Sequence, residues 1–214
     1  MTGASARALG TMAGAGAATS LLSLRSLPAA SLAAAIVFLF AAPLFTLDRR
    51  ARRPGRGFAA VSTGILVFSL AAVLIGGMSF GTVAAVAGLL LVFATAALGL
   101  GLFASTVASD EISAAFWTYL LLVALAAGPL LAGPWIPWIP APEKGIELLL
   151  LASPLVSVSA ACDLDIMRTE ALYRWTPIGQ WRFHYPHWSS SFAFGLALSG
   201  LFFAGSFFKK EHRT

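Results

Sequence analysis

Two long apolar runs, Val83–Ala104 and Ile112–Ala132, constrain this chain more than any other feature. Each has about the twenty residues that a helix needs to cross the hydrocarbon core of a bilayer. Neither run contains a charge, and the polar connector between them carries Asp110 and Glu111. Because such helices offer no polar face to water and satisfy their own backbone groups, the pattern predicts a helical hairpin in lipid.

The composition extends this prediction to the whole chain. Of the 214 residues, 58% are hydrophobic and 11% are charged, with a mean hydropathy of +0.84. Soluble domains carry roughly 25% charged residues. We therefore expect an all-α, polytopic integral membrane protein, a bundle of five or six transmembrane helices plus a short re-entrant or interfacial helix. Residues 1–214 are expected to form a single membrane domain.

Five arginines gather in a short loop between two apolar runs. The net charge of +5 is compatible with nucleic-acid binding, but basic residues in short loops beside spans set membrane orientation instead. We expect no nucleic-acid partner, and we place this loop on the cytoplasmic side of the inner (plasma) membrane. It serves either as an anchor that meets anionic membrane lipid or as a docking surface for a cytoplasmic partner. The arginines are Arg49, Arg50, Arg52, Arg53 and Arg56.

Further apolar runs predict transmembrane helices over residues 29–132. Residues 1–28 hold a weaker run, Ala8–Leu24, which is interpreted as either a first span or an interfacial segment. The stronger runs are Leu32–Leu47, Phe58–Ile75 and, beyond a glycine-rich turn over Gly76–Gly81, the hairpin described above.

The connector of the hairpin is expected to cap the helix that follows it. Ser109 can act as the N-cap, and Asp110 and Glu111 complement the positive end of the helix dipole. These two acids are also candidates for contact with a cytoplasmic partner. Before the connector, Ala97 and Gly101 are small residues four apart, a spacing that favours close helix packing, within the chain or between subunits.

Residues 133–189 read as an outer segment rich in proline and aromatic residues. Four prolines within Gly133–Pro142 argue against a helix there, and the two tryptophans prefer the headgroup level. Ile146–Cys162 is apolar but short, so it predicts either a thin span or a re-entrant helix. We favour the re-entrant interpretation because it leaves the basic tail, residues 209–214, in the cytoplasm.

The stretch Asp163–Trp188 mixes aromatic rings with charges, as interfacial segments do, with rings toward lipid and charges toward water. The final span is expected over residues 190–208. It carries two small-residue pairs, Gly195/Ser199 and Gly200/Ala204, typical of helix packing. The candidate interfacial residues are Trp175, Trp181, Arg182, His184, His187 and Trp188.

Motifs for bond chemistry are scarce. We find no Walker motif and no HExxH zinc motif. His184 and His187 have ligand-like spacing without a nearby third ligand, and Asp163 and Asp165 are better explained as members of an ion-paired loop than as an acid–base or metal pair. The single cysteine, Cys162, excludes an internal disulfide. We therefore expect no enzyme activity, no cofactor and no metal site in this chain.

A resemblance to a known family lies in the stretch Leu98–Tyr119. A glycine-containing span, Ser105, the connector Ser109–Glu111 and an Ala-rich next span resemble the middle region of the type-2 ABC exporter permeases. Ser153–Pro154, before a final span, is similar to that family's external re-entrant region. The resemblance covers residues from near Phe58 to Phe208.

The resemblance implies a permease subunit of an ABC-type transporter. Such a subunit pairs with a second permease subunit, binds a separate cytoplasmic ATPase and moves a substrate between its helices. The alternative is a non-catalytic structural subunit of a larger, energy-transducing membrane complex. A membrane enzyme built on Asp163–His187 is the third and least favoured hypothesis.

Overall fold

The computed structural model describes residues 27–47, 54–74, 78–138, 141–167 and 183–211. Several predictions lie outside these ranges: the weak run Ala8–Leu24, four of the five loop arginines, and Trp175, Trp181 and Arg182. Within the described ranges the chain is helical and contains no β-strand. The helices are α2 (Leu27–Ala41), α3 (Leu44–Leu47), α4 (Pro54–Leu74), α5 (Phe80–Val107), α6 (Glu111–Leu131), the 3-10 helix η1 (Gly133–Trp138), α7 (Pro142–Ala152), α8 (Pro154–Ala161) and α10 (Trp188–Glu211).

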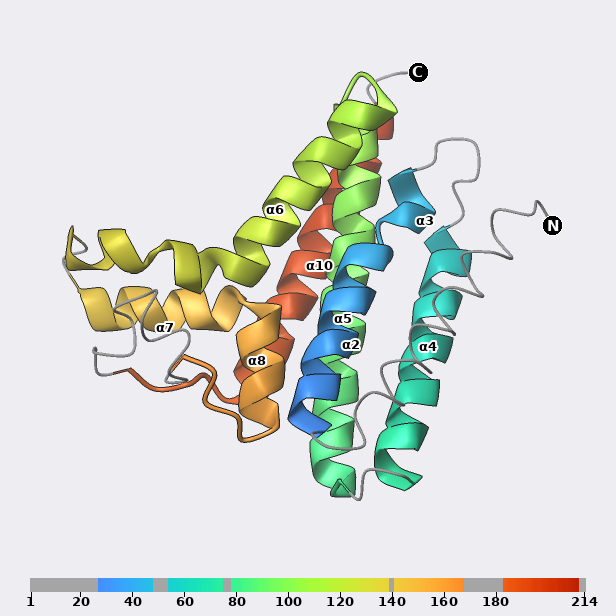
Figure 1. Cartoon of the computed structure of the whole chain (residues 1–214). Helices are drawn as coiled ribbons and strands as arrows, with labels where there is room; N and C mark the ends of the chain where they lie inside the picture. Colours follow the sequence, from blue (N-terminus) through green and yellow to red (C-terminus); the bar gives the residue numbers. More distant parts are fainter. Residues whose placement is uncertain (1–26, 48–53, 75–77, 139–140, 168–182, 212–214) are drawn as a thin grey trace.

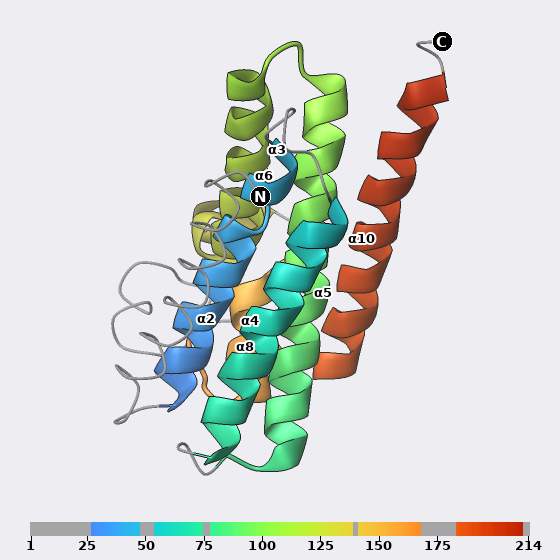
Figure 2. The same ribbon diagram turned by 90° about the vertical axis from the view of Figure 1, so that its right-hand side faces the viewer.

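The predicted all-α, multi-pass membrane architecture is confirmed. Five helical segments of the described chain are long and apolar enough to cross a bilayer. The 28-residue helix α5 lies at the centre of the bundle and packs against α2, α3, α4, α6, α8 and α10 (Figures 1 and 2). The candidate spans are Ala29–Leu47, Gly55–Leu74, Phe80–Val107, Glu111–Leu131 and Trp188–Phe207.

The predicted run over Leu32–Leu47 corresponds to one candidate span, Ala29–Leu47, whose helix is interrupted at Pro43. Proline cannot donate a backbone hydrogen bond, so α2 ends before it and the short α3 begins after it. The Thr46 hydroxyl donates to the carbonyls of Pro43, at 3.1 Å, and of Leu98, at 3.2 Å. A Cβ on Gly101 would meet that hydroxyl at 2.5 Å, so the small residue at 101 serves packing within the chain.

Helices α5 and α10 interlock because glycines on each accept bulky side chains from the other. A Cβ on Gly99 would lie 3.1 Å from the Phe203 ring. The reverse holds at Gly205, where a Cβ would lie 3.0 Å from the Phe103 ring. These close approaches explain why α10 lies along most of α5 (Figure 2). Close packing of this kind is what holds helices together in lipid, where apolar burial gives little driving force.

The turn before α5 is shorter than predicted. Gly81 lies inside α5, and the residue that ends the turn is Ser79, the N-cap of the helix. The Ser79 side-chain oxygen accepts a hydrogen bond from the Thr82 backbone N–H at 3.1 Å. The prediction of a turn reaching Gly81 was wrong because it gave glycine more weight than the Ser capping signal.

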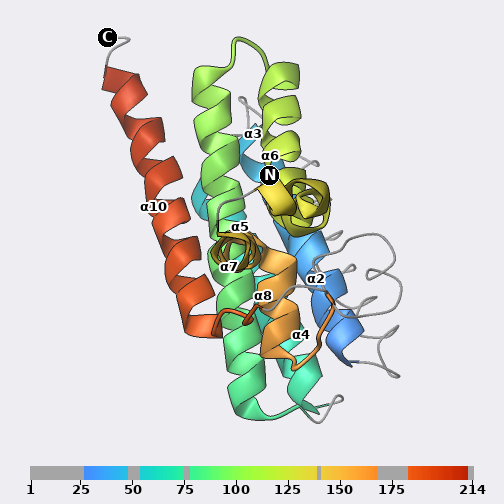
Figure 3. The same cartoon turned by 90° about the vertical axis from the view of Figure 1, so that its left-hand side faces the viewer.

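The chain after α6 does form helix despite its prolines, contrary to the prediction for Gly133–Pro142. The run Gly133–Trp138 forms a 3-10 helix, and Pro142 opens α7 at a position where its missing N–H costs nothing. Ile146–Cys162 is not one segment, because α7 and α8 meet at an angle of 86° at Ser153. Helix α7 projects sideways from the bundle (Figure 1) and is seen nearly end-on in Figure 3, while α8 lies alongside α5 and α2.

A second, smaller core holds this outer segment together. We call η1 and α7 the arm. Its buried residues meet α8 and the chain on either side of residues 168–182. Phe183, expected to face lipid, is 7% exposed and packs in this core. The buried members are Ile136, Ile146, Leu150, Val156, Met167 and Phe183.

Candidate functional site

Four chain segments lie at one end of the bundle, which we call the connector end. They are the end of α3, the start of α4, the α5–α6 connector and the last turns of α10 (Figure 1). The arginine loop runs between the first two of these segments, so the described Arg56 marks where it enters α4. The end of α10 reaches the same end of the bundle, as the predicted position of the basic tail requires.

The α5–α6 connector is fixed by Asp110. Its carboxylate accepts hydrogen bonds from the Ser113 backbone N–H at 2.7 Å and from the Ser113 hydroxyl at 2.8 Å. The Ser109 hydroxyl donates to the same carboxylate at 3.0 Å. The N-cap of α6 is thus Asp110 and not the predicted Ser109. The hydrogen bond from the Ser113 backbone, followed by those from the Ser113 and Ser109 hydroxyls, lowers the pKa of Asp110 below its ordinary value of 3.8.

Charged side chains are displayed at this end. Asp110, Glu111 and Arg56 are all exposed. Glu111 opens α6, where its charge complements the helix dipole. Arg56 lies in the first turn of α4, which contains no acidic residue, so its charge opposes the dipole there. The helix dipole explains why Glu111 lies at the start of α6, but it does not explain why Arg56 lies at the start of α4. Arg56 therefore remains a candidate for anchoring or docking.

On the arm side, His184 contacts an acid that lies far away in the sequence. Its backbone N–H donates to a Glu147 carboxylate oxygen at 3.4 Å, and its Nδ1 lies 3.5 Å from the same oxygen. This contact ties the chain before α10 to α7. The histidine side chain is 96% exposed, and its interfacial role stays a prediction. The isolated Glu147 in an otherwise apolar run was the sequence signal for a partner of this kind.

The two aspartates considered as an acid–base or metal pair have separate structural roles. Asp163 has a positive φ of 55° and ends α8, where the Leu164 N–H donates to the Ser159 carbonyl at 2.9 Å. Asp165 instead accepts a hydrogen bond from the Tyr185 hydroxyl. That hydroxyl also accepts a hydrogen bond from the Met167 N–H at 3.2 Å. Tyr185 thus connects the chain segments that lie before and after residues 168–182.

The other histidine of the pair serves the start of α10. The His187 Nδ1 lies 2.8 Å from the Ser189 hydroxyl. Its ring centroid lies 5.6 Å from that of Trp188, which is exposed. Among the residues that the structure describes, no three His, Cys, Asp or Glu side chains gather as a metal site would require. His184 and His187 are therefore not brought together as ligands of a described site.

One motif that sequence reasoning missed is Gly77–Gly81, which has the Gly-x-Ser-x-Gly spacing of hydrolase nucleophile elbows. Such an elbow follows a strand, whereas this stretch follows the helix α4. The Ser79 hydroxyl lies 2.9 Å from that of Thr82 and caps α5. Its hydrogen bonds and its surroundings are those of a helix cap.

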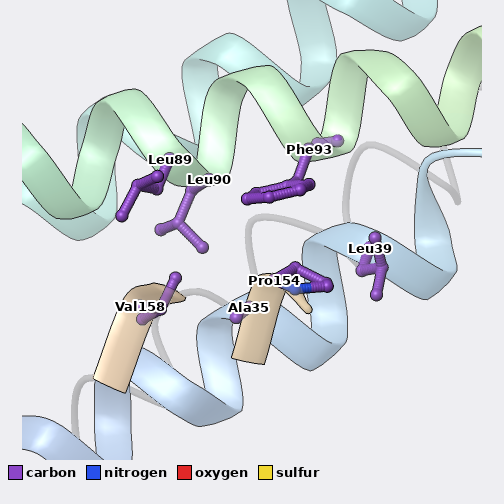
Figure 4. Close-up of a pocket in the computed structure, with 8 residues that line it drawn as sticks. Ala35, Leu39, Leu89, Leu90, Phe93, Pro154 and Val158 are labelled. Carbon is purple, nitrogen blue, oxygen red and sulfur yellow. The ribbon is translucent and has the colours of Figure 1, made fainter. Parts of the chain in front are cut away.

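A small cavity lies between α2, α5 and α8. Leu89, Leu90 and Phe93 of α5 face Leu39 of α2 and Val158 of α8 across it (Figure 4). Its walls are apolar and its free volume is about 10 Å³, which is at most the space of one water molecule. This cavity therefore cannot hold a substrate.

No protein-family model matches the chain, and comparisons with curated proteins and with solved structures found no match. The functional assignment therefore rests on the residues described above.

Proposed function

We propose that this chain is the permease subunit of an ABC-type exporter in the inner (plasma) membrane, and that it moves a substrate of unknown class. The observation that carries the proposal is the connector end. There a rigidly capped connector displays Asp110 and Glu111 at the same end of the bundle as Arg56 and the end of α10. A cytoplasmic ATPase needs a firm, charged contact of this kind to transmit a conformational change.

A passage between two permease subunits is compatible with the cavity that the described residues enclose. That cavity, among α2, α5 and α8, is too small for a substrate, and we place the passage between the subunits. Helix α6 presents a broad apolar face for a partner or for lipid. Its exposed large residues are Ile112, Phe116, Trp117, Leu120, Leu121, Val123 and Leu131.

The alternative, a structural subunit of a larger membrane complex, is favoured by α10. Its pair Gly195/Ser199 packs on α5, where a Cβ on Gly195 would meet Val92 at 2.8 Å. Its second pair, Gly200/Ala204, is exposed, and a Cβ on Gly200 would meet nothing within 4 Å. Such an open face suits neighbours in a large assembly as well as it suits lipid.

Purification of the full chain in mild detergent separates the two functions. We expect a nucleotide-binding ATPase to co-purify with the wild-type chain and to be lost from the double variant Arg56→Glu/Glu111→Lys, which reverses two of the charges displayed at the connector end. The matched control Glu143→Lys reverses an exposed charge on the arm and should keep the ATPase. Recovery of a large complex without an ATPase would refute the permease assignment, and equal recovery from both variants would refute the docking site.

A further inference from the structure

The end of α6 combines three features of a hinge. Pro129 lies inside the helix. Because proline has no N–H, the carbonyl of Leu125, four residues earlier, loses its helical partner. Gly128 precedes the proline, and a Cβ there would meet nothing within 4 Å, so no neighbour requires glycine at this position. Proline within a helix is among the commonest causes of bending.

A second break lies beside the first in space. Ser153 is the residue at which α7 and α8 meet at 86°. Its buried hydroxyl donates to the carbonyl of Ala126 in α6 at 3.0 Å. The same oxygen is 3.5 Å from the Val156 N–H, which it caps weakly. One hydroxyl therefore bridges the two breaks, although Ala126 and Ser153 lie 27 residues apart in sequence.

The segment between the breaks is held together by its own contacts. The arm residues Ile136, Ile146 and Leu150 are fully buried in the small core. Helix α6 inclines away from the bundle before it reaches the arm (Figure 1). The arm shares this core with Met167 and Phe183, and it meets the bundle at the two adjacent breaks, at Val156 of α8 and where α7 contacts α10. Bending at the two breaks would let this packed unit turn as one body.

We propose that the arm swings about Pro129 and Ser153, and that the hydrogen bond from the Ser153 hydroxyl to the Ala126 carbonyl is the latch that holds its present position. With the latch closed, the two flexible points are joined by a direct bond in a buried environment. With the latch open, the weakened last turns of α6 allow the arm to tilt relative to α5. The proposed motion does not depend on the permease function. Only the use of this motion in moving a substrate rests on the proposed function.

Spin-label distances in the purified full chain, reconstituted in lipid nanodiscs, test this motion without any ATPase. Cys162 is first replaced by serine. One label pair joins the arm to the bundle, at Trp138→Cys and Leu70→Cys, and a reference pair lies within the bundle, at Leu70→Cys and Leu201→Cys. All three labelled positions are exposed, which allows labelling without disturbance of either core.

Ser153→Ala should broaden the arm-to-bundle distance distribution or add a second distance to it, and it should leave the reference pair unchanged. The control Ser157→Ala removes another fully buried hydroxyl, one that donates to the Ser153 carbonyl at 2.9 Å and not to α6, and should change neither pair. Adding Pro129→Ala to Ser153→Ala restores a donor for the Leu125 carbonyl, so the arm distance should narrow again.

Three results would overturn the hinge. An unchanged arm distance in Ser153→Ala would show that the hydroxyl is no latch. Broadening of both pairs would show a general loss of packing in place of a local motion. Persistent broadening in the double variant would show that Pro129 is not the pivot. Failure of ATPase co-purification would leave all of these distances unaffected, so the two proposals fail separately.

Discussion

At the scale of single residues, the glycines of this chain divide into those that packing requires and those that it does not. Gly99, Gly101, Gly195 and Gly205 each lie where a Cβ would come within 3.1 Å of a side chain from another helix. A Cβ on Gly200, in contrast, would meet nothing within 4 Å. The spacing of small residues predicted close packing, but spacing alone could not show which of the two pairs on α10 faces α5.

Substitution separates these groups. Gly195→Ala places a methyl group against the Val92 side chain and should lower the stability of the bundle by about 1–3 kcal/mol, the usual cost of overpacking. Gly200→Ala, five residues on in the same helix, should leave stability unchanged or raise it by up to about 1 kcal/mol. Thermal unfolding in detergent measures both variants. Equal destabilisation by the two would contradict the packing described for α5 and α10.

Asp163 occupies a left-handed backbone conformation at the end of α8. Glycine adopts this conformation without strain, so Asp163→Gly should be neutral or stabilising by up to about 1 kcal/mol. Asp163→Ala should be destabilising by about 1 kcal/mol, since it keeps the strain and loses the polar side chain. If the carboxylate instead took part in a metal or acid–base site, both variants would lose function equally while keeping their stability.

At the scale of elements, hydrophobic length predicted the spans, while boundaries depended on local chemistry. The runs over Phe58–Ile75, Ile112–Ala132 and residues 190–208 all correspond to observed helices. Pro43 divided the first span, and Ser79 and Asp110 set the starts of α5 and α6. The two helix starts depend on which of several adjacent polar residues reaches a free N–H, and sequence alone offers equal candidates.

The cap of α6 makes a prediction about pH. The pKa of Asp110 is lower in the folded chain than its ordinary value of 3.8. The cap therefore contributes its full stabilisation above that value, and the contribution is lost as the pH falls through the folded-state pKa. Asp110→Ala should unfold at a lower temperature than the wild type at pH 7, and the difference should shrink below about pH 3.8.

Asp110→Asn is the matched control, since it keeps a capping oxygen without the charge. It should lie between the wild type and Asp110→Ala at pH 7 and show little further change in acid. A difference between the wild type and Asp110→Ala that stayed constant from pH 7 to pH 3 would contradict the role of the ionised carboxylate.

The arrangement of the arm could be predicted from the sequence only in part. The short apolar run Ile146–Cys162 predicted either a thin span or a re-entrant helix, and the 86° bend at Ser153 was not foreseen. The small core around Ile136 and Phe183 was not foreseen. It joins residues 47 positions apart, and neither hydrophobic period nor charge pattern reports contacts at that distance. Phe183 was consequently assigned to lipid.

At the scale of the whole molecule, the bundle has two chemically different ends. The connector end displays Arg56, Asp110 and Glu111, and the last turns of α10 reach the same end. The α4–α5 turn, which ends at Ser79, lies at the opposite end (Figure 1). The basic loop predicts from the sequence that the connector end faces the cytoplasm, and this orientation stays a prediction.

Side-specific labelling of single cysteines in intact cells tests the membrane topology most directly. In a Cys162→Ser background, Ser79→Cys should react with a membrane-impermeant thiol reagent added from outside. Arg56→Cys and Ser109→Cys should react only after the membrane is permeabilised. Labelling of Ser79 and Ser109 positions from the same side would contradict a chain in which α5 crosses the membrane and the connector end faces the cytoplasm.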